Sequence, residues 1–411
     1  MKMIIGGQKV DSYSGKTIDV VNPATGEFID TIPAATPEDV NRALDISKIG
    51  FEKWSKTPVA RRKEIFQRFI DLMYREDNMR WIIKTTAQEM GSNAFFAGYG
   101  MDSIKDLLMG YIETMRRYDG KVMVPNAEPG DAGMPSNDLM MVVHEPVGTV
   151  ISVLPFNGPM LMFGFKVCPA LAAGNSVIIK PASDDPLVII KLVELMHEAG
   201  VPGETLQIIT GRGSDLGYSL FDDPRIDAVT MTGSTDLGRE IAKYGAKYLY
   251  PCELELGGND PCIIMNDVDD VKSIALQAAS IRLNNGGQVC VSPKRMIVHK
   301  DIAEEFTQTI LEYFKTVEIG YFTDIDRAFD ELTEKYGRFP TLQELMMESG
   351  NYIGSHNYIQ PIISEKAAIT VEKQINHTIE QGAKLLYGGK RHGCFIEPTL
   401  LADIDVYKRQ C

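Results

Sequence analysis

The sequence predicts an α/β protein built on a doubly wound parallel sheet. Between residues 146 and 258, short apolar segments alternate with amphipathic ones, a pattern typical of parallel strands joined by right-handed helical crossovers. Strands are expected at 148–155, 175–181, 206–211, 226–233 and 250–258. Each ends in a short motif of Gly, Pro or polar residues. Because such sheets bind ligands beyond the carboxyl ends of their strands, these motifs hold the candidate functional residues.

Helices are expected before and between these strands. After a short β start, Thr36 is placed to cap a helix, since Pro37 suits its first position. A later helix is expected to begin with Asp185 as its cap and to end at Gly200. Other helices are expected at 61–76, 79–90, 160–174, 213–221 and 234–245, and a loop rich in Pro and Gly at 121–138.

The composition excludes several classes of protein. The chain has 411 residues, with 44% hydrophobic and 24% charged residues, which suits two or three globular domains. A net charge of −14 argues against a general nucleic-acid-binding protein, which needs a basic face. The cysteines form no CxxC pair and the histidines no HExxH motif, so no metal site is expected.

The sequence favours a soluble, reduced, cytoplasmic protein. The apolar part of MKMIIGGQKV is too short for a signal peptide. Residues 146–165 carry no charge and approach the length of a membrane span, but Pro155, Gly158 and Pro159 interrupt the centre. We interpret that segment as a buried strand, a turn and a buried helix.

Two glycine motifs at successive strand ends are candidate phosphate sites. Gly213 lies in GRGSDLG, and Gly233 and Ser234 lie in TGSTDLG. Gly233 lets a backbone approach a phosphate, while Ser234 can donate its hydroxyl and cap the next helix, whose dipole favours an anion. The alternative is two tight turns without a ligand, and GxGxxxG departs from the dinucleotide pattern.

The motif KPAS at 180–183 bears on cofactor choice. Lys180 is either a solvated lysine or a donor to the hydroxyls of the adenosine ribose. A carboxylate at the position of Ser183 would bond the ribose 2′-OH of NAD and repel the 2′-phosphate of NADP. Serine permits NADP, but Asp184 follows it, so both cofactors stay open.

Cys290 is a candidate nucleophile. It follows NNGGQ, so a glycine-rich loop holds it. A buried, inert thiol is the commoner state of an intracellular cysteine, and Cys168 and Cys262, within apolar segments, fit that alternative. The local sequence leaves both interpretations of Cys290 open.

Together, these motifs resemble the aldehyde dehydrogenase superfamily, and its succinate-semialdehyde-dehydrogenase-like members in particular. The resemblance runs from about residue 20 to about residue 404. It implies oxidation of an aldehyde to a carboxylic acid with NADP or NAD. The motifs that carry it keep the family's order and separations: PFN at 155–157, KPAS at 180–183, TGS at 232–234, ELGG at 255–258 and GGQVC at 286–290.

The resemblance implies a role for each motif residue. Cys290 would form a thiohemiacetal and then a thioester, with Asn157 and the Cys290 N–H as donors to the oxyanion. Glu255 would be the general base for hydrolysis, with Glu253 a weaker candidate. The implied cofactor-binding residues are Phe156, Lys180, Pro181, Ser183, Gly213, Gly233, Ser234 and Leu256, the last against the nicotinamide.

The resemblance also implies domains and partners. Residues 1–122 and 146–256 would form the dinucleotide-binding domain, 123–145 a small β hairpin for oligomerisation, and 257–404 an incomplete α/β catalytic domain. The partners expected are a small aldehyde and, for the full-length parent, further copies in a homodimer or homotetramer. Neither nucleic acid nor a membrane is expected.

Several features depart from the family. Met231 stands where Phe is usual, and ELGGND replaces ELGGK. The stretch near 321–360 looks like an insertion of two amphipathic helices without an assigned function. The chain ends before the family's Glu-x-Phe-Gly-Pro motif, and 405–411, DVYKRQC, looks like an artefactual tail. The activity of the chain itself therefore stays open.

Alternatives to an aldehyde-oxidising enzyme also stay open. A CoA-acylating relative would pass the acyl group to CoA, and would need no base such as Glu255. A non-catalytic protein could keep the fold and bind nucleotide. A cysteine hydrolase is disfavoured, because no histidine lies in a strand-end motif.

Overall fold

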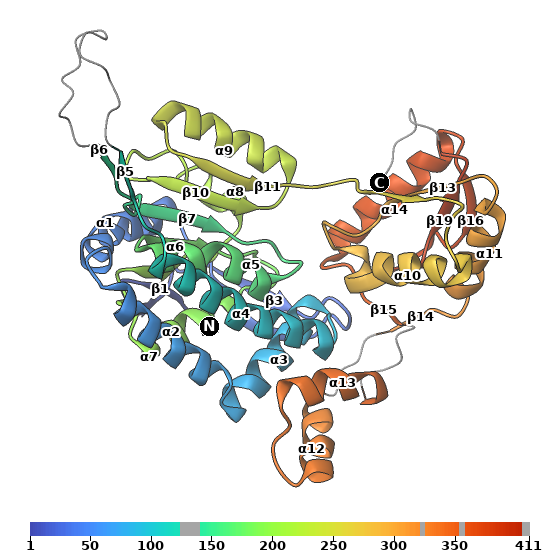
Figure 1. Ribbon diagram of the computed structural model, residues 1–411, viewed down its shortest axis with the longest axis horizontal. Coiled ribbons are helices and arrows are strands. Elements are labelled where there is room, and N and C mark those ends of the chain that lie inside the picture. The colour runs from blue at the N-terminus through green and yellow to red at the C-terminus, as the bar shows by residue number, and fades with distance from the viewer. Residues whose placement is uncertain (124–139, 321–324, 353–357, 405–411) are drawn as a thin grey trace.

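The computed structural model describes residues 1–123, 140–320, 325–352 and 358–404 (Figure 1). A seven-stranded sheet, ordered β11-β10-β7-β8-β9-β1-β2, forms the centre of the N-terminal part, residues 1–256. Its parallel strands are β7 (Thr149–Val153), β8 (Ser176–Lys180), β9 (Leu206–Ile208), β10 (Ala228–Thr232) and β11 (Cys252–Glu255). All five were expected as strands, and the predicted fold class is confirmed.

The strand order reverses beside β7. The chain runs from β7 to β8 and β9, and then returns to place β10 and β11 on the opposite side of β7. In doubly wound sheets, ligands bind at this reversal, outside the carboxyl ends of the strands. Two short strands, β1 (Met3–Ile5) and β2 (Gln8–Val10), extend the far edge of the sheet in antiparallel pairing.

Helices cover both faces of the sheet, because its strands are apolar on both sides. Ile178 of β8 packs in the core formed with α1 (Pro37–Trp54) and α9 (Thr235–Tyr248). Its neighbours Val177 and Ile179 pack in the opposite core. The helices of that second core include α2 (Val59–Met73), α3 (Glu76–Met90), α4 (Ala94–Arg116), α6 (Cys168–Ala173) and α7 (Leu187–Ala199).

The segment from 159 to 173, which follows β7 after a short non-helical stretch, is helical, as expected. It begins with α5 (Pro159–Met162), continues as a π-helical turn over Phe163–Val167, and ends in α6. No helix among the described residues is long and apolar enough to cross a membrane. A second hairpin pairs β3 (Thr17–Val21) with β4 (Phe28–Pro33).

The C-terminal part, from residue 257, has its own core. A parallel pair, β12 (Pro261–Ile264) and β13 (Arg295–Val298), packs against α10 (Val271–Leu283) and α11 (Ala303–Phe314). Toward its end lie α14 (Glu365–Glu380), β16 (Lys384–Tyr387), β17 (Arg391–His392), β18 (Phe395–Ile396) and β19 (Leu400–Ala402). An extended stretch after β11 joins the two parts (Figure 1).

Two helices interrupt the C-terminal part, as the sequence predicts for the insertion. They are α12 (Ile325–Tyr336) and α13 (Leu342–Tyr352), and they lie between the paired strands β14 (Glu318–Ile319) and β15 (Tyr358–Ile359). Figure 1 shows both helices beside α3 and α4 of the N-terminal part. Residues 321–324 and 353–357 of the expected insertion lie outside the described residues.

The expected oligomerisation hairpin is described only at its base. There, β5 (Lys121–Met123) pairs antiparallel with β6 (Met140–Val142). Residues 124–139 of this hairpin, and the expected tail at 405–411, lie outside the described residues.

Candidate active site

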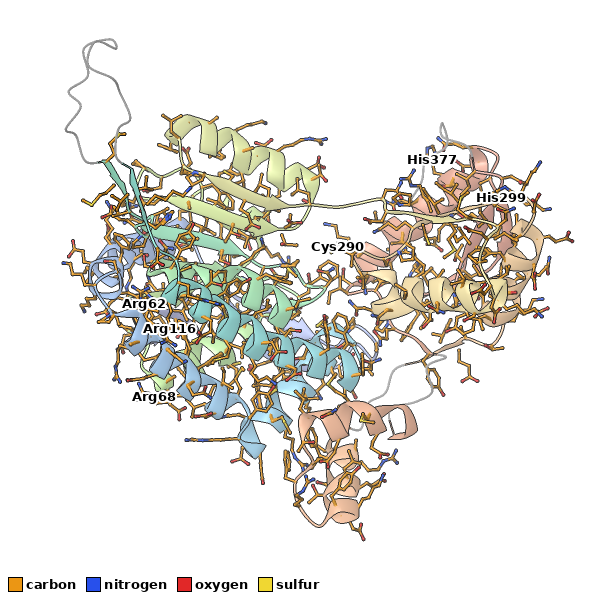
Figure 2. All side chains as sticks on the ribbon, viewed as in Figure 1. Arg62, Arg68, Arg116, Cys290, His299 and His377 are labelled. Atoms are coloured by element: carbon orange, nitrogen blue, oxygen red, sulfur yellow. The ribbon has the colours of Figure 1, made fainter. Side chains whose placement is uncertain are left out.

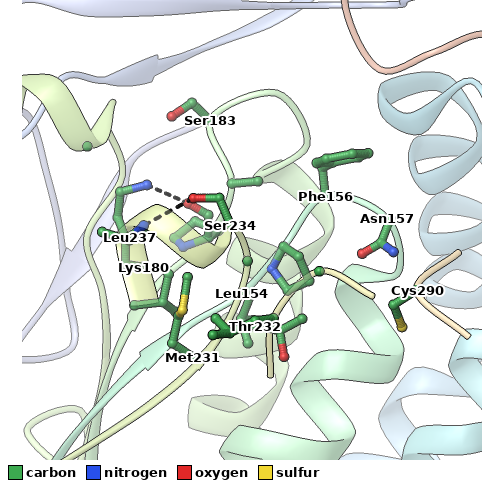
Figure 3. A pocket seen from close by; sticks show the side chains of 18 of the residues that line it. Leu154, Phe156, Asn157, Lys180, Ser183, Met231, Thr232, Ser234, Leu237 and Cys290 are labelled. Carbon is green, nitrogen blue, oxygen red and sulfur yellow. Dashed lines mark hydrogen bonds between the residues drawn. The ribbon is translucent and has the colours of Figure 1, made fainter. Parts of the chain in front are cut away.

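A cavity of about 910 Å³ lies beyond the carboxyl ends of β7, β8, β10 and β11 (Figure 3). Its walls come from both parts of the chain, including Gly257, Gly258 and Gly287 to Cys290. Almost every residue singled out from the sequence lines it: Phe156, Asn157, Lys180, Pro181, Ser183, Gly213, Gly233, Ser234, Leu256 and Cys290. Glu255 is absent from the lining.

One end of the cavity carries a buried cation. Lys180, the last residue of β8, is only 8% exposed, and its Nζ donates a hydrogen bond to the Pro181 carbonyl (2.6 Å). Burial lowers the pKa of Lys180 to about 8, an effect that the nearby carboxylates of Asp184 and Asp185 partly offset. Ser183 Oγ donates to the Gly211 carbonyl (2.9 Å), which joins the loops after β8 and β9.

The turn after β10 presents a helix N-terminus to the same end. Ser234 caps α9, as expected, because its Oγ accepts a hydrogen bond from the Leu237 N–H (3.3 Å). The Gly233 N–H donates to the Glu255 carbonyl (3.0 Å), which ties the end of β10 to the end of β11. The positive end of the α9 dipole therefore faces a turn without a side chain, an arrangement that suits an anion.

The opposite end carries an exposed thiol on a strained loop. Asn285, Gly286 and Gly287 all have positive φ angles (52°, 63° and 79°), so the chain turns sharply before Cys290. Cys290 is exposed and lies where the two parts of the chain face each other (Figure 2). Cys168 is buried, and burial raises its thiol pKa, as the alternative of an inert thiol predicts.

Asn157 and Cys290 lie at the same end of the cavity (Figure 3). The Asn157 side-chain amide donates a hydrogen bond to the Gln288 carbonyl, two residues before Cys290, at 2.8 Å. An amide carries two N–H donors, so this bond fixes the orientation of Asn157 and leaves one donor for another acceptor. On the other side of the loop, Lys294 Nζ donates to the Cys290 carbonyl (2.7 Å).

The two candidate bases share the exposed face of β11, as the strand period predicts. Glu253 accepts a hydrogen bond from the Thr230 hydroxyl and pairs with the buried ammonium of Lys166 (3.1 Å). Glu255 is exposed at the last position of β11, directly before the cavity-lining residue Leu256. The base role of Glu255 stays a prediction.

The prediction that Asp185 caps α7 is wrong. The Asp185 carboxyl is fully buried and has no hydrogen-bond partner among the described residues. Instead, the carboxyl of Glu89, in α3, accepts the Leu187 N–H (2.8 Å) and the Val188 N–H (2.9 Å). Glu89 therefore occupies the free donors that Asp185 was expected to cap. It lies 98 residues before Leu187, and no local sequence signal marks it.

Burial of this carboxyl pair makes stability depend on pH. Burial raises the pKa of Glu89 to about 8, and burial together with the neighbouring Glu89 raises the pKa of Asp185 well above its ordinary value. The folded chain therefore binds protons more tightly than the unfolded chain does. The stability from this source is fully present below the ordinary carboxyl pKa, and it is lost as pH rises toward 8.

We expect Asp185→Asn to stabilise the protein relative to the wild type as the pH rises toward 8, because an amide cannot ionise in this buried position beside Glu89. The gain should shrink at pH 5, where the wild-type carboxyls are protonated. Thermal unfolding at several pH values measures both effects. Asp215→Asn, which changes an exposed carboxylate, is the matched control. An equal shift at pH 5 and pH 8 would contradict the assignment.

The model of the aldehyde dehydrogenase family matches residues 9–409. The chain belongs to the aldehyde dehydrogenase family. It is 31% identical to the mitochondrial succinate-semialdehyde dehydrogenase of Arabidopsis thaliana over 407 residues, which cover 98% of this chain and 69% of the relative. It is 30% identical to the D-glyceraldehyde dehydrogenase (NADP(+)) of Picrophilus torridus over 412 residues, which cover 98% of this chain and 75% of that protein.

A solved structure of the family confirms the fold. A point mutant of betaine aldehyde dehydrogenase from Staphylococcus aureus, in complex with NAD+, superposes with a TM-score of 0.85. The two are 27% identical, and the match covers 99% of this chain and 76% of that chain. These findings confirm the predicted class of enzyme, an oxidoreductase of the aldehyde dehydrogenase family. Both NADP-dependent and NAD-bound members occur among the relatives.

Proposed function

We propose that this chain oxidises an aldehyde to a carboxylic acid with NADP or NAD, through a covalent intermediate on Cys290. One observation carries the proposal. A single cavity holds Cys290 and Asn157 at one end, and Lys180, Ser183 and the N-terminus of α9 at the other (Figure 3). An exposed thiol and an end suited to anions on one cavity suit an enzyme that works on a dinucleotide.

The cavity fits a dinucleotide in size and chemistry. About 910 Å³ lies near the upper end of the range of ligand pockets, about 300–1,000 Å³. Lys180 would donate to ribose hydroxyls, and Gly233 with Ser234 would hold the pyrophosphate at the start of α9. Leu256 supplies an apolar wall for the nicotinamide, which accepts the hydride from the substrate carbon when the cofactor is bound.

The residues of the chain would perform the covalent steps. The Cys290 thiolate attacks the aldehyde carbon and forms a C–S bond, while the carbonyl oxygen becomes an oxyanion. The second N–H of Asn157 and the Cys290 backbone N–H donate to that oxyanion. Loss of hydride from the same carbon restores the carbonyl as a thioester. Glu255 takes a proton from water, whose oxygen attacks the thioester and releases the acid and the thiolate.

A product assay tests this proposal. The chain is mixed with NADP or NAD and with succinate semialdehyde, D-glyceraldehyde or betaine aldehyde, which differ in charge. We expect reduced cofactor and free carboxylic acid in the absence of CoA. Turnover that requires CoA and yields a thioester would support a CoA-acylating enzyme. Cofactor binding without oxidation of any aldehyde would support a non-catalytic nucleotide-binding protein.

We expect Ser183→Glu to lower kcat/KM for NADP by about 10-fold or more, with little change for NAD, because a carboxylate repels a 2′-phosphate. Asp184→Asn makes the opposite change, because it removes a carboxylate one residue away. It should therefore raise kcat/KM for NADP. Initial rates with both cofactors measure each ratio. Equal losses for NADP and NAD in Ser183→Glu would contradict a 2′-phosphate site beside this residue.

We propose the domain boundaries and the oligomerisation role that the sequence suggested. The base of the 123–145 hairpin supports subunit pairing, because Val122, Met141 and Val143 are about two-thirds exposed (66%, 65% and 69%) and apolar. Light scattering of the chain and of Met141→Glu compares their masses.

We also propose a cytoplasmic location, since the cysteines of the described residues are free thiols, which suits a reducing compartment.

A further inference from the structure

Residues 360–363 contact the loop that carries Cys290. This anchor segment, as we name it, follows β15 directly, at the point where the chain returns from the inserted helices. Gly286 of the nucleophile loop, residues 284–290, lies so close that a Cβ there would be 2.8 Å from the Gln360 carbonyl oxygen. The two segments therefore meet backbone to backbone, at a position that only glycine fills without displacement.

Gln288 bonds the nucleophile loop to the anchor segment. Its Nε2 donates to the Pro361 carbonyl (3.1 Å) and to the Asn285 carbonyl (2.9 Å). Its Oε1 accepts the Ile363 N–H (2.9 Å). Both donors of the Gln288 amide are used, and its oxygen has a partner. One side chain therefore bonds the loop to itself and to the anchor segment, 73 and 75 positions away in the chain.

The same residue also orients Asn157. Its backbone carbonyl accepts the Asn157 side-chain amide (2.8 Å), and the Asn285 side chain donates to the Asn157 carbonyl (3.4 Å). A displaced Gln288 would therefore move the thiol of Cys290 and would free the amide proposed to stabilise the oxyanion. The nucleophile and its oxyanion donor depend on one set of hydrogen bonds.

The inserted helices and the anchor segment each pack against the N-terminal part. Phe329 and Leu345 are fully buried in the core that includes α3 and α4. Arg80 of α3 pairs with Asp330 of α12 (2.7 Å) and lies over the Phe329 ring (5.1 Å). At the end of α3, a Cβ on Gly91 would be 2.4 Å from the Pro361 ring, so the anchor segment itself packs against that helix.

We propose that Gln288 is a positioning residue for Cys290, and that α12 and α13 act as a brace that holds its anchor segment in place. The inference rests on the proposed function, because it assigns Cys290 the role of nucleophile. It also gives the insertion a structural role, since its two helices pack on α3 and α4 and the anchor segment that follows it in the chain contacts the nucleophile loop.

Gln288→Met tests the positioning role, because methionine keeps the length of the side chain and loses all its hydrogen bonds. We expect kcat to fall about 10- to 100-fold, with Kd for NADP within about twofold of the wild type. Alkylation of Cys290 by iodoacetamide, followed by peptide mass spectrometry, should slow about 10-fold, since the loop no longer holds the thiol in its exposed position at the cavity. Circular dichroism shows whether the variant folds.

Gln288→Glu gives the same test if the methionine variant does not fold, because it keeps an acceptor for the Ile363 N–H and loses both donors. Unchanged kcat and unchanged alkylation in either folded variant would overturn the proposal. Alkylation does not depend on turnover. Should Cys290→Ala retain activity, the proposed function fails, while the alkylation rate still decides whether Gln288 positions this loop.

The brace is tested with Leu345→Glu, which places a charge in the core contact of α13. We expect faster hydrogen exchange in α12 and α13, faster exchange of the Ile363 amide, and a fall in kcat of about 10-fold. Gly98→Val is a second variant that disturbs the contact between α4 and α13, because its side chain would collide with Met346 of α13. Glu331→Gln breaks only a pair within α12 and is the control. Faster hydrogen exchange in α12 and α13, together with unchanged exchange of the Ile363 amide and full kcat, would overturn the proposal that these helices hold the anchor segment in place.

Discussion

Replacing Cys290 with alanine should abolish aldehyde oxidation, with a loss in kcat of more than about 10⁴-fold, because no other cysteine among the described residues lines the cavity. Cofactor binding should persist, since Lys180, Ser183 and Ser234 lie at the other end of the cavity. Formation of reduced cofactor from an aldehyde measures the first effect, and a binding titration with NADP measures the second.

Cys262→Ala is the matched control for this prediction. Cys262 is a half-buried thiol in β12 of the same C-terminal part, and it does not line the cavity. We expect the control to keep its turnover within about twofold, as a conservative change away from the site does. Substantial aldehyde oxidation by Cys290→Ala would exclude a covalent mechanism through this residue, whatever the control shows.

Most of the candidate site could be predicted from the sequence, because its residues follow strands in order. The alternation of strands and helices fixes a parallel sheet, and the carboxyl ends of parallel strands meet at one edge. Asn157, Lys180 and Gly233 therefore had to lie near one another, although the chain separates them widely. Cys290 lies beyond the sheet, and only the family resemblance linked it to these residues.

The parts that could not be predicted are contacts between distant segments. Gln288 belongs to the quoted motif GGQVC, yet its partners Pro361 and Ile363 follow an insertion whose position in space no local pattern reveals. Glu89 resembles any other acid on an amphipathic helix until the fold buries it against α7. Local propensity reports neither desolvation nor a tertiary partner, so both roles became visible only in the structure.

Glu255 illustrates a limit of another kind. The sequence places it within an expected strand at 250–258, whereas the structure ends β11 at Glu255 and gives its side chain an exposed position outside the cavity lining. A side chain at a strand end can reach either side of the following turn. The two residues that follow it, Leu256 and Gly257, line the cavity. The base assignment thus needs a functional measurement.

Replacing Asn157 with alanine should lower kcat by about 10²–10³-fold, the usual cost of losing one oxyanion donor. One N–H of this amide already bonds the Gln288 carbonyl, which leaves the other N–H for the proposed oxyanion. Asn157→Asp should lose at least as much, because a carboxylate has no such donors and repels the developing negative charge. Steady-state kinetics with a saturating aldehyde measures both variants.

The binding of cofactor separates this donor role from a general disturbance of the cavity. Kd for NADP should stay within about twofold in both Asn157 variants, because a donor that acts on a developing charge stabilises the transition state and not the bound cofactor. Asn266→Ala, which removes an exposed amide from the C-terminal part, is the control. Full kcat in Asn157→Ala would show that the Cys290 N–H is a sufficient oxyanion donor, and it would remove Asn157 from the mechanism.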